Sequence, residues 1–418
     1  MNTESFFDVL IIGGGASGMM AALSVKKHHP DYTVSILDRT FELGRKMTIS
    51  GAGRANVTNS NLAKDPQQFF HGDHTLLTSV FHQFGYKNII GFFEELGIPL
   101  IEEKKTGSGK LFPVMEHAKT VRNIYIDRLK EARVGMQTDT SVSELKQEGD
   151  RWIVTSNNGI YSSRYVILAT GGKTYPALGS DGSGYDLAVS LGHRIIPPVP
   201  SAVPLVSKNL LSHLLQGEKM IMSVTSIIDG KEQKTAIGEV LLTQYGFSGP
   251  LILDVSRDIS IRINREGKTD TTLQCSFFPQ SSRADVEQMI RNRLKKHPTL
   301  PVSHGLWGLL TEKVAGAVCQ IAGIPKEKCV QDVSEQEIIN LIDVLTAYTT
   351  EVTQTRGWNE AEFTAGGIAG EEIVPETLES KKAKGLYVAG ELVDVDGPVG
   401  GYNLSWAWAS GWVAGKLQ

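Results

Sequence analysis

Short apolar runs near both ends of the chain predict buried parallel strands. Residues 9–12 read Val-Leu-Ile-Ile, residues 34–37 read Val-Ser-Ile-Leu, and residues 386–389 read Leu-Tyr-Val-Ala. Runs this short and this apolar, rich in β-branched residues, are typical of strands covered on both faces. Residues 152–155 and 165–169 predict two further strands around an Asn-Asn-Gly turn, a β-meander returning to the same sheet.

In the middle of the chain, the spacing of apolar residues predicts both helices and strands. Helical patterns occur at about 88–96 and 118–133, and the proline-dense residues 195–200 predict a break in regular structure and an exit from the first domain. Short strands with turn signals fill 203–278, and a helical pattern fills 283–345. Strands return near Thr353 and at 363–368, so we expect one discontinuous domain made from both chain ends with an insertion between them.

A glycine motif follows the first predicted strand, at residues 13–18 (Gly-Gly-Gly-Ala-Ser-Gly). Gly13 suits a tight turn, Gly15 lets the backbone approach a pyrophosphate, and Gly18 lets the next helix pack on the strand. Asp38 ends the second strand, about twenty residues later, where a carboxylate can accept a ribose hydroxyl. This arrangement predicts a Rossmann dinucleotide site without distinguishing FAD from NAD.

The C-terminal segment favours FAD. Gly390 and Glu391 end a predicted strand, where the carboxylate can bind a ribityl hydroxyl, and Gly400-Gly401 precedes a predicted helix through residues 403–408. A helix N-terminus aimed at the pyrimidine edge of a flavin stabilises the negative charge that develops there on reduction. Glycine motifs at both ends of the chain therefore predict a fold around one extended FAD.

The amino-acid composition limits the classes of protein to which the chain can belong. The 418 residues exceed one ordinary core, and 41 % hydrophobic with 21 % charged residues is typical of a soluble globular protein. A net charge of −4 gives no overall attraction to nucleic acid or anionic membrane. Three cysteines without a C-x-x-C pair, and the absence of a signal peptide or a long apolar stretch, predict a cytoplasmic protein with no membrane partner. Ten histidines show no metal spacing, so no metal is expected.

Several segments together resemble a known family. The matching residues are 13–18, 44–59, 171–173, 245–250, 364–368 and 385–411. In that order they resemble the BaiN/RdsA-like family of bacterial three-domain NAD(P)/FAD-dependent oxidoreductases, also called aminoacetone-oxidase-like flavoproteins. The chain departs from the family at Ala55, where members usually carry a cysteine. A family mechanism that uses that thiol is therefore in question for this chain.

The resemblance implies an α/β fold with non-covalently bound FAD. The fold would be an FAD-binding Rossmann-like domain of the glutathione-reductase type, with an inserted antiparallel β-barrel-like domain and a small helical insert. The boundaries we predict are 1–197 and 351–418 for the FAD domain, 198–282 for the β-barrel-like insert and 283–350 for the helical insert.

Candidate site residues follow from these motifs. Arg54 is the predicted polarising cation, with binding of an FAD phosphate as an equal alternative, and Lys173 and Tyr175 are candidate proton sources. Lys46 is expected on phosphate or ribose, and Asn56 fixes a loop or contacts the flavin edge. The residues predicted to bind the cofactor are Gly13, Gly15, Ala16, Ser17, Gly18, Asp38, Arg39, Lys46, Gly53, Arg54, Asn56, Val142, Thr170, Gly171, Gly172, Gly390, Glu391, Asp394, Gly400, Gly401, Tyr402 and Asn403.

The resemblance also implies an activity. We expect hydride transfer from reduced flavin to a carbonyl-conjugated C=C bond, with uridine in 23S rRNA, giving dihydrouridine, as the leading substrate. The alternatives are a small-molecule enone reductase, an amine or aminoacetone oxidase, and a non-catalytic flavin-dependent binding or redox-sensing module. The middle of the chain has no second Rossmann motif, so NAD(P)H or another redox partner would dock transiently. Basic residues suited to RNA occur at 26–29, at 104, 105 and 110, at 291–297, and at 381, 382 and 384.

Overall fold

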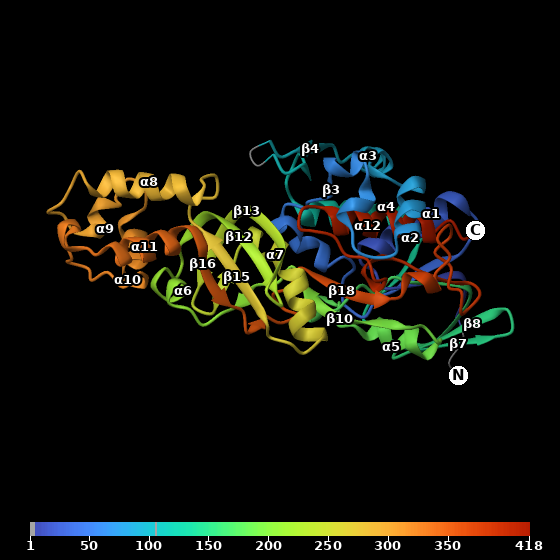
Figure 1. Cartoon of the computed structure of the whole chain (residues 1–418). Coiled ribbons are helices and arrows are strands. Elements are labelled where there is room, and N and C mark those ends of the chain that lie inside the picture. Colours follow the sequence, from blue (N-terminus) through green and yellow to red (C-terminus); the bar gives the residue numbers. More distant parts are fainter. Residues whose placement is uncertain (1–4, 105–106) are drawn as a thin grey trace. The chain divides into compact units, whose positions relative to one another are not determined.

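The computed structural model describes residues 5–104 and 107–418, and the predicted RNA-binding Lys105 lies outside them. The chain forms two compact units. Unit 1 contains the residues up to Val199 and from Glu362 onward, and unit 2 contains Pro200–Ala361. The N-terminal segment, blue in Figure 1, and the C-terminal segment, red, lie together in unit 1.

Unit 1 is built on a seven-stranded sheet. Four parallel pairings join β6 to β2, β2 to β1, β1 to β9 and β9 to β19, and antiparallel β8 and β7 continue from the first half of β9. Val9 of β1 pairs with Val34 on one side and Tyr165 on the other, and Leu386 of β19 pairs with Val166 of β9. The strands are β1 Ser5–Ile12, β2 Val34–Leu37, β6 Gly135–Gln137, β7 Val142–Glu148, β8 Arg151–Ser156, β9 Gly159–Leu168 and β19 Leu386–Val388.

Helices from both chain ends pack beside this sheet. α1 (Ala16–His28) packs on α12 (Tyr402–Ala414), and the Ser24 hydroxyl donates to the Trp412 carbonyl at 2.6 Å. The ring of Trp408 stacks on Tyr125 with centroids 5.5 Å apart, within an aromatic cluster that burial stabilises. The other helices of unit 1 are α2 His74–Gln83, α3 Tyr86–Glu95, α4 Ala118–Glu131 and α5 Ser183–Ser190.

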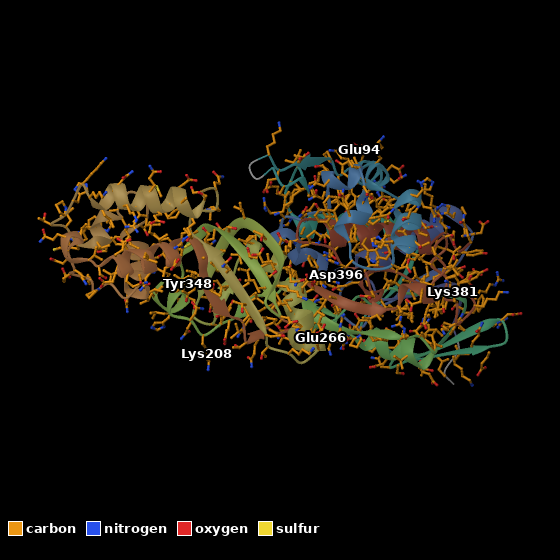
Figure 2. The ribbon with its side chains drawn as sticks, viewed as in Figure 1. Glu94, Lys208, Glu266, Tyr348, Lys381 and Asp396 are labelled. Carbon is orange, nitrogen blue, oxygen red and sulfur yellow. The ribbon has the colours of Figure 1, made fainter. Side chains whose placement is uncertain are left out.

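A glycine-rich segment after β2 leads to a small accessory sheet. Residues Lys46–Gly53 form a 3-10 helix with a kink at Ser50–Ala52. A three-stranded sheet follows, in the order β3 (Thr58–Asn59), β5 (Lys110–Pro113) and β4 (Leu100–Glu102). Figure 2 shows the charged side chains of Glu94 and Lys381 on the outside of unit 1, whereas Asp396 is buried.

The proline-rich segment differs from the prediction. Residues 195–200 were expected to break regular structure, but they lie within strand β10 (Ile195–Ser201), which pairs with β18 (Phe363–Ile368) in a two-stranded sheet. Proline lacks an N–H, yet it is tolerated in a strand that has no partner on its other edge. The break in regular structure predicted from the prolines is therefore wrong.

Unit 2 combines a second seven-stranded sheet with helices around one core. Its strand order is β16, β15, β12, β13, β14, β11 and β17. The closure of this sheet into a barrel and the separate helical domain remain predictions. The strands are β11 Leu205–Val206, β12 Lys219–Ile228, β13 Lys231–Thr243, β14 Gly246–Ser248, β15 Thr271–Ser276, β16 Tyr348–Glu351 and β17 Gln354–Thr355. The helices are α6 Leu210–Leu214, α7 Pro250–Ser260, α8 Arg283–Leu294, α9 Val302–Gly305, α10 Glu312–Ile321 and α11 Glu335–Ala347.

Candidate functional site

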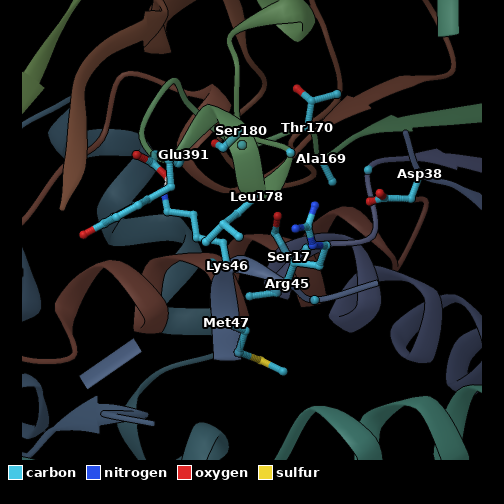
Figure 3. Close-up of a pocket in the computed structure, with 18 of the residues that line it drawn as sticks. Ser17, Asp38, Arg45, Lys46, Met47, Ala169, Thr170, Leu178, Ser180 and Glu391 are labelled. Carbon is cyan, nitrogen blue, oxygen red and sulfur yellow. Dashed lines mark hydrogen bonds and ion pairs between the residues drawn. The ribbon is translucent and has the colours of Figure 1, made fainter. Parts of the chain in front are cut away.

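A cavity of about 420 Å³ opens in unit 1 where β1, β2 and β9 end. Ile12, Leu37 and Ala169 lie at or just after these three strand ends and line the cavity. In the sheet, β1 lies between β2 and β9, so the chain continues from β1 to one side and later to the other. Ligands of open α/β sheets bind outside the carboxyl ends of the strands at such a point. Figure 3 shows Asp38 and Glu391 on opposite sides of the view, with Ser17 between them.

The start of α1 forms the central part of the wall. Gly13, Gly15, Ala16 and Ser17 line the cavity. No side chain caps the helix and its first turn contains no acidic residue, so its N–H groups and the positive end of its dipole are available to an anion. A Cβ atom on Gly15 would meet no protein atom within 4 Å. Gly15 therefore keeps space free for a ligand.

The third glycine of the motif has a packing role. Gly18 does not line the cavity, and a Cβ atom there would lie 1.9 Å from the carbonyl oxygen of Gly13. Gly18 therefore lets α1 pack closely on the turn, and the approach of a pyrophosphate to Gly15 stays a prediction.

Asp38 lies in the wall at the end of β2. One carboxylate oxygen accepts from the Gly14 N–H at 2.6 Å, and the other accepts from the N–H and hydroxyl of Thr40 at 2.8 and 2.6 Å. The carboxylate therefore holds the glycine turn as well as facing the cavity. Arg39, also in the wall, forms an ion pair with Asp181.

Lys46 and Glu391 meet at the other side of the cavity. The Lys46 ammonium donates to Glu391 Oε2 at 2.8 Å and to the Thr174 hydroxyl, and Glu391 Oε1 accepts from the Thr364 N–H at 2.7 Å. Figure 3 shows the Lys46 side chain beside Glu391. These residues come from four separate chain segments, so this part of the site depends on tertiary structure.

Glu362 and Phe363 also line the cavity, and the sequence analysis missed both. Burial raises the pKa of the Glu362 carboxyl, and the nearby positive charge of Lys46 partly opposes that increase. A single glutamate before a predicted strand carries no motif, so sequence pattern gave no signal for it.

The start of α12 provides a second helix terminus. Asn403, Leu404, Trp406 and Ala407 contribute to the wall, and Gly401 (φ +95°) precedes the helix without a side-chain cap. The side chain of Asn403 accepts from the Gly397 N–H at 2.9 Å and donates to the Gly397 carbonyl at 2.8 Å, which fixes the approach to the helix.

Some of the other predicted residues line the cavity, and the rest lie outside its wall. Beyond those described above, Val142, Thr170, Gly171 and Tyr175 line the cavity. The residues outside its wall are Gly18, Gly53, Arg54, Asn56, Gly172, Lys173, Gly390, Asp394, Gly400, Gly401 and Tyr402. Their predicted roles in binding or catalysis remain predictions.

Arg54 has protein partners instead. Its guanidinium pairs with Glu103 at 3.0 Å and Glu116 at 3.8 Å and lies 4.2 Å from the ring centroid of Phe112. The adjacent Ala55 is 2 % exposed and does not line the cavity.

Asn56 supports the loop. In the amide orientation that satisfies both of its atoms, it donates to the carbonyls of Leu111 and Thr58 at 3.2 Å and accepts from the Gly401 N–H at 3.0 Å. It thereby ties the glycine-rich segment to the start of α12.

The cavity fits FAD. The α1 terminus and the space at Gly15 suit a pyrophosphate, and Asp38 and Glu391 bring to the wall two carboxylates, a group that can accept hydrogen bonds from sugar hydroxyls. The hydroxyls of Thr170 and Ser180, both in the wall, are buried without a hydrogen-bond partner among the described residues. Buried hydroxyls normally have partners, so these two point to polar groups of a ligand.

The fold and this site define an FAD-dependent oxidoreductase with a Rossmann-type cofactor domain. The model of the HI0933-like protein Rossmann domain family matches residues 7–417, and the chain belongs to that family. This confirms the resemblance, the Rossmann-like α/β fold and the FAD cofactor predicted from the sequence.

Two curated relatives match along the whole chain. A 3-dehydro-bile acid delta(4,6)-reductase of Clostridium scindens is 32 % identical over 406 residues, 97 % of each chain. A ribosomal RNA dihydrouridine synthase of Escherichia coli is 28 % identical over 414 residues, 98 % of this chain and 97 % of the relative.

Solved structures share the fold at low identity. The FrdA subunit of Escherichia coli quinol fumarate reductase is 13 % identical with a TM-score of 0.51, covering 99 % of this chain and 70 % of FrdA. A flavocytochrome c3 fumarate reductase is 16 % identical with a TM-score of 0.50, covering 99 % of this chain and 78 % of that protein.

The described residues contain no helix long and apolar enough to cross a membrane. They also contain no group of three or more His, Cys, Asp or Glu side chains that could hold a metal ion.

Proposed function

We propose that this oxidoreductase reduces a C=C bond conjugated to a carbonyl group. The observation that carries the proposal is the chemistry shared by the two relatives' names, a bile acid reductase and a dihydrouridine synthase. Dihydrouridine is uridine with its ring C=C bond reduced, and that bond is conjugated to a carbonyl. One reaction type therefore covers both names.

The residues of the cavity suit this reaction. When bound, reduced FAD supplies a hydride to the β-carbon of the substrate. The N–H groups at the start of α1 would hold the pyrophosphate, and the Lys46–Glu391 pair would orient the ribityl end. The dipole at the start of α12 would stabilise negative charge on the nearby pyrimidine edge.

For the substrate we favour a small enone over RNA because most of the predicted RNA-binding cations have partners within the protein. Lys27 pairs with Glu95, Arg291 pairs with Glu287 and Glu335, and the Lys381 ammonium donates to the Glu371 carbonyl. Uridine in rRNA remains the second candidate, because residues 295–297 (Lys-Lys-His), just beyond the end of α8, are exposed.

We also propose NAD(P)H as a transient electron donor and the cytoplasm as the location. The three cysteines form no disulfide, which suits a reducing compartment.

A half-reaction experiment tests the proposal. Purified protein is reduced with NAD(P)H without oxygen and mixed with a steroid enone, and the return of oxidised flavin absorbance is followed with mass analysis of the product. We expect enone-dependent reoxidation and a product two hydrogens richer, with free FAD as the control. An enone that leaves the flavin reduced, together with rapid reoxidation by oxygen and release of peroxide, would instead support an oxidase.

The RNA alternative has its own test. Mass mapping of 23S rRNA from cells lacking the gene, with and without its restoration, would show dihydrouridine lost and regained if rRNA is the substrate. Unchanged dihydrouridine would remove rRNA and leave the small enone.

A further inference from the structure

The cavity wall contains two acidic side chains that none of the sequence motifs explains: Asp181, which pairs with Arg39, and Glu362. Glu362 directly precedes strand β18 and is half-buried in the cavity wall beside Phe363. Its carboxylate makes no hydrogen bond or close ion pair with any described residue, and its backbone carbonyl accepts from the Thr174 hydroxyl at 3.4 Å. Since buried carboxylates are normally paired, a group that lines a ligand cavity without a partner is a candidate for chemistry.

Its neighbours place Glu362 near the Lys46–Glu391 pair. Thr174, which holds the Glu362 carbonyl, also accepts from the Lys46 ammonium, and that ammonium binds Glu391. The other charged residues in the cavity wall are Asp38, Arg39, Arg45 and Asp181. Glu362 therefore shares its end of the cavity with the Lys46–Glu391 pair, and Lys46 is already engaged by Glu391.

The electrostatic surroundings keep this carboxyl protonated to a higher pH than usual. Burial raises its pKa because the ionised form loses hydration, and the positive charge of Lys46 lowers it less than burial raises it. A carboxylic acid that retains its proton in a buried site can donate that proton to a substrate. Ala55, by contrast, has no ionisable group.

We propose that Glu362 is the catalytic acid that protonates the α-carbon of the substrate after hydride has reached the β-carbon. This inference rests on the proposed reduction of a conjugated C=C bond. It assigns the proton donation for which the sequence had suggested Lys173 or Tyr175. Of those two, Tyr175 lines the cavity and Lys173 does not.

The proposed step balances. Hydride addition at the β-carbon converts the enone into an enolate, and the two electrons come from the reduced cofactor, which a nicotinamide donor has reduced beforehand. The O–H bond of Glu362 then breaks as a C–H bond forms at the α-carbon and the C=C of the enolate returns to C=O. The Glu362 carboxylate regains a proton from water before the next turnover.

The first test needs no substrate. Infrared difference spectra of the FAD-loaded protein, recorded between acidic and mildly alkaline pH, report the C=O band of a protonated carboxylic acid. We expect a band in the parent that persists to higher pH than an ordinary glutamic acid would give, that disappears in Glu362→Gln and that remains in Glu371→Gln, a matched change at an exposed glutamate of unit 1. A band that persists in Glu362→Gln would overturn the assignment of the proton to Glu362.

The second test follows the transferred proton. Reduced parent, Glu362→Gln, Glu371→Gln and Tyr175→Phe proteins are mixed with a steroid enone in D2O in a single turnover, and deuterium at the α-carbon is located by NMR. We expect Glu362→Gln to reoxidise about 100-fold more slowly or to lose stereospecific deuteration, whereas Glu371→Gln behaves as the parent and Tyr175→Phe keeps the parental stereochemistry of deuteration. Parental rate and stereochemistry in Glu362→Gln, or loss of both in Tyr175→Phe alone, would overturn the proposal.

Failure of the proposed function gives a different result. If the enone reoxidises none of the four proteins, including the parent, then the reduction itself is wrong. The infrared band still shows whether Glu362 holds a proton in the cofactor cavity. FAD content and the rate of reduction by NAD(P)H, measured in all four proteins, separate a lost proton donor from a damaged site.

Discussion

The two sides of the cavity are built in different ways. At the start of α1 the ligand would meet mainly backbone, supplied by Gly13, Gly15, Ala16 and Ser17 in one short stretch. At the other side it would meet the side chains of Lys46, Glu362 and Glu391, which are brought together from distant parts of the chain. The backbone side can hold any pyrophosphate, whereas the side-chain side determines the orientation and the chemistry.

This difference explains why binding and catalysis should respond to different changes. A single added side chain can block the backbone side, because its function depends on empty space at Gly15. The side-chain end has mutually dependent charges, so removing one partner leaves the other uncompensated.

Gly15→Glu should abolish FAD binding while preserving the fold. The new side chain enters open space, where its carboxylate repels the pyrophosphate, so the Kd for FAD should rise about 100-fold or more. Fluorescence titration measures the Kd and circular dichroism measures the fold. Gly91→Ala is the control because a Cβ atom there also meets nothing within 4 Å, and parental affinity in Gly15→Glu would show that the pyrophosphate binds elsewhere.

Lys46→Met should weaken FAD binding by about 10- to 100-fold, because Glu391 loses a charged hydrogen bond in the cavity wall. Lys130→Met removes an exposed ion pair with Asp127 and should leave the affinity unchanged. The same titration compares the two variants. Equal affinities in both would mean that the Lys46–Glu391 pair does not contact the cofactor.

Arg54→Gln distinguishes a structural role of Arg54 from its predicted catalytic role. Loss of the Glu103 ion pair and the Phe112 contact should lower the free energy of unfolding by about 0.5–1 kcal/mol. If the guanidinium stays there during turnover, the enone-dependent rate should remain within a few-fold of the parent. A rate loss of about 100-fold would show that Arg54 moves to polarise the substrate, as the sequence suggested.

Glu362→Gln should change how stability depends on pH. The raised pKa of Glu362 means that its protonated form stabilises the folded state below the pKa of the unfolded chain, and that this stabilisation is lost as pH rises through the raised folded value. Parent and variant should therefore have similar Tm values at low pH. At pH 8 we expect the flavin-free variant to melt about 1–2 °C higher, as measured by scanning calorimetry. A difference that does not vary with pH would contradict the raised pKa.

Ala55→Cys should have the smallest effect. The side chain at position 55 is buried outside the cavity wall, so restoring the thiol usual in the family should leave the rate of enone reduction unchanged. Stopped-flow reoxidation of the two proteins measures this. A faster variant would show that the thiol reaches the reacting groups.

The sequence predicted the strands, turn and helices around the backbone side because their determinants are local. The strand at 9–12, the turn at Gly13 and the packing of Gly18 follow one another in the chain, and the C-terminal strand and helix were equally recognisable from their glycines. The β10 strand shows the limit of this approach, since prolines that predict a break locally are accepted where one strand edge has no partner.

The side-chain end could not be predicted in the same way. Glu362 acquires its significance from burial and from the distant Lys46, neither of which leaves a pattern around residue 362. The sequence favours Arg54 because its loop would cover the isoalloxazine and its guanidinium carries a fixed fork of donors, but Glu103, Glu116 and Phe112 provide it with partners. Whether a side chain binds a ligand or another residue depends on which side chains the fold brings together.

A crystal structure with bound FAD tests the central claim most directly. We expect the pyrophosphate at the N–H groups that begin α1, the ribityl chain beside Glu391, and the isoalloxazine ring between Glu362 and the start of α12. A ring bound at the Asp38 side of the cavity, or FAD bound outside the cavity, would contradict the account.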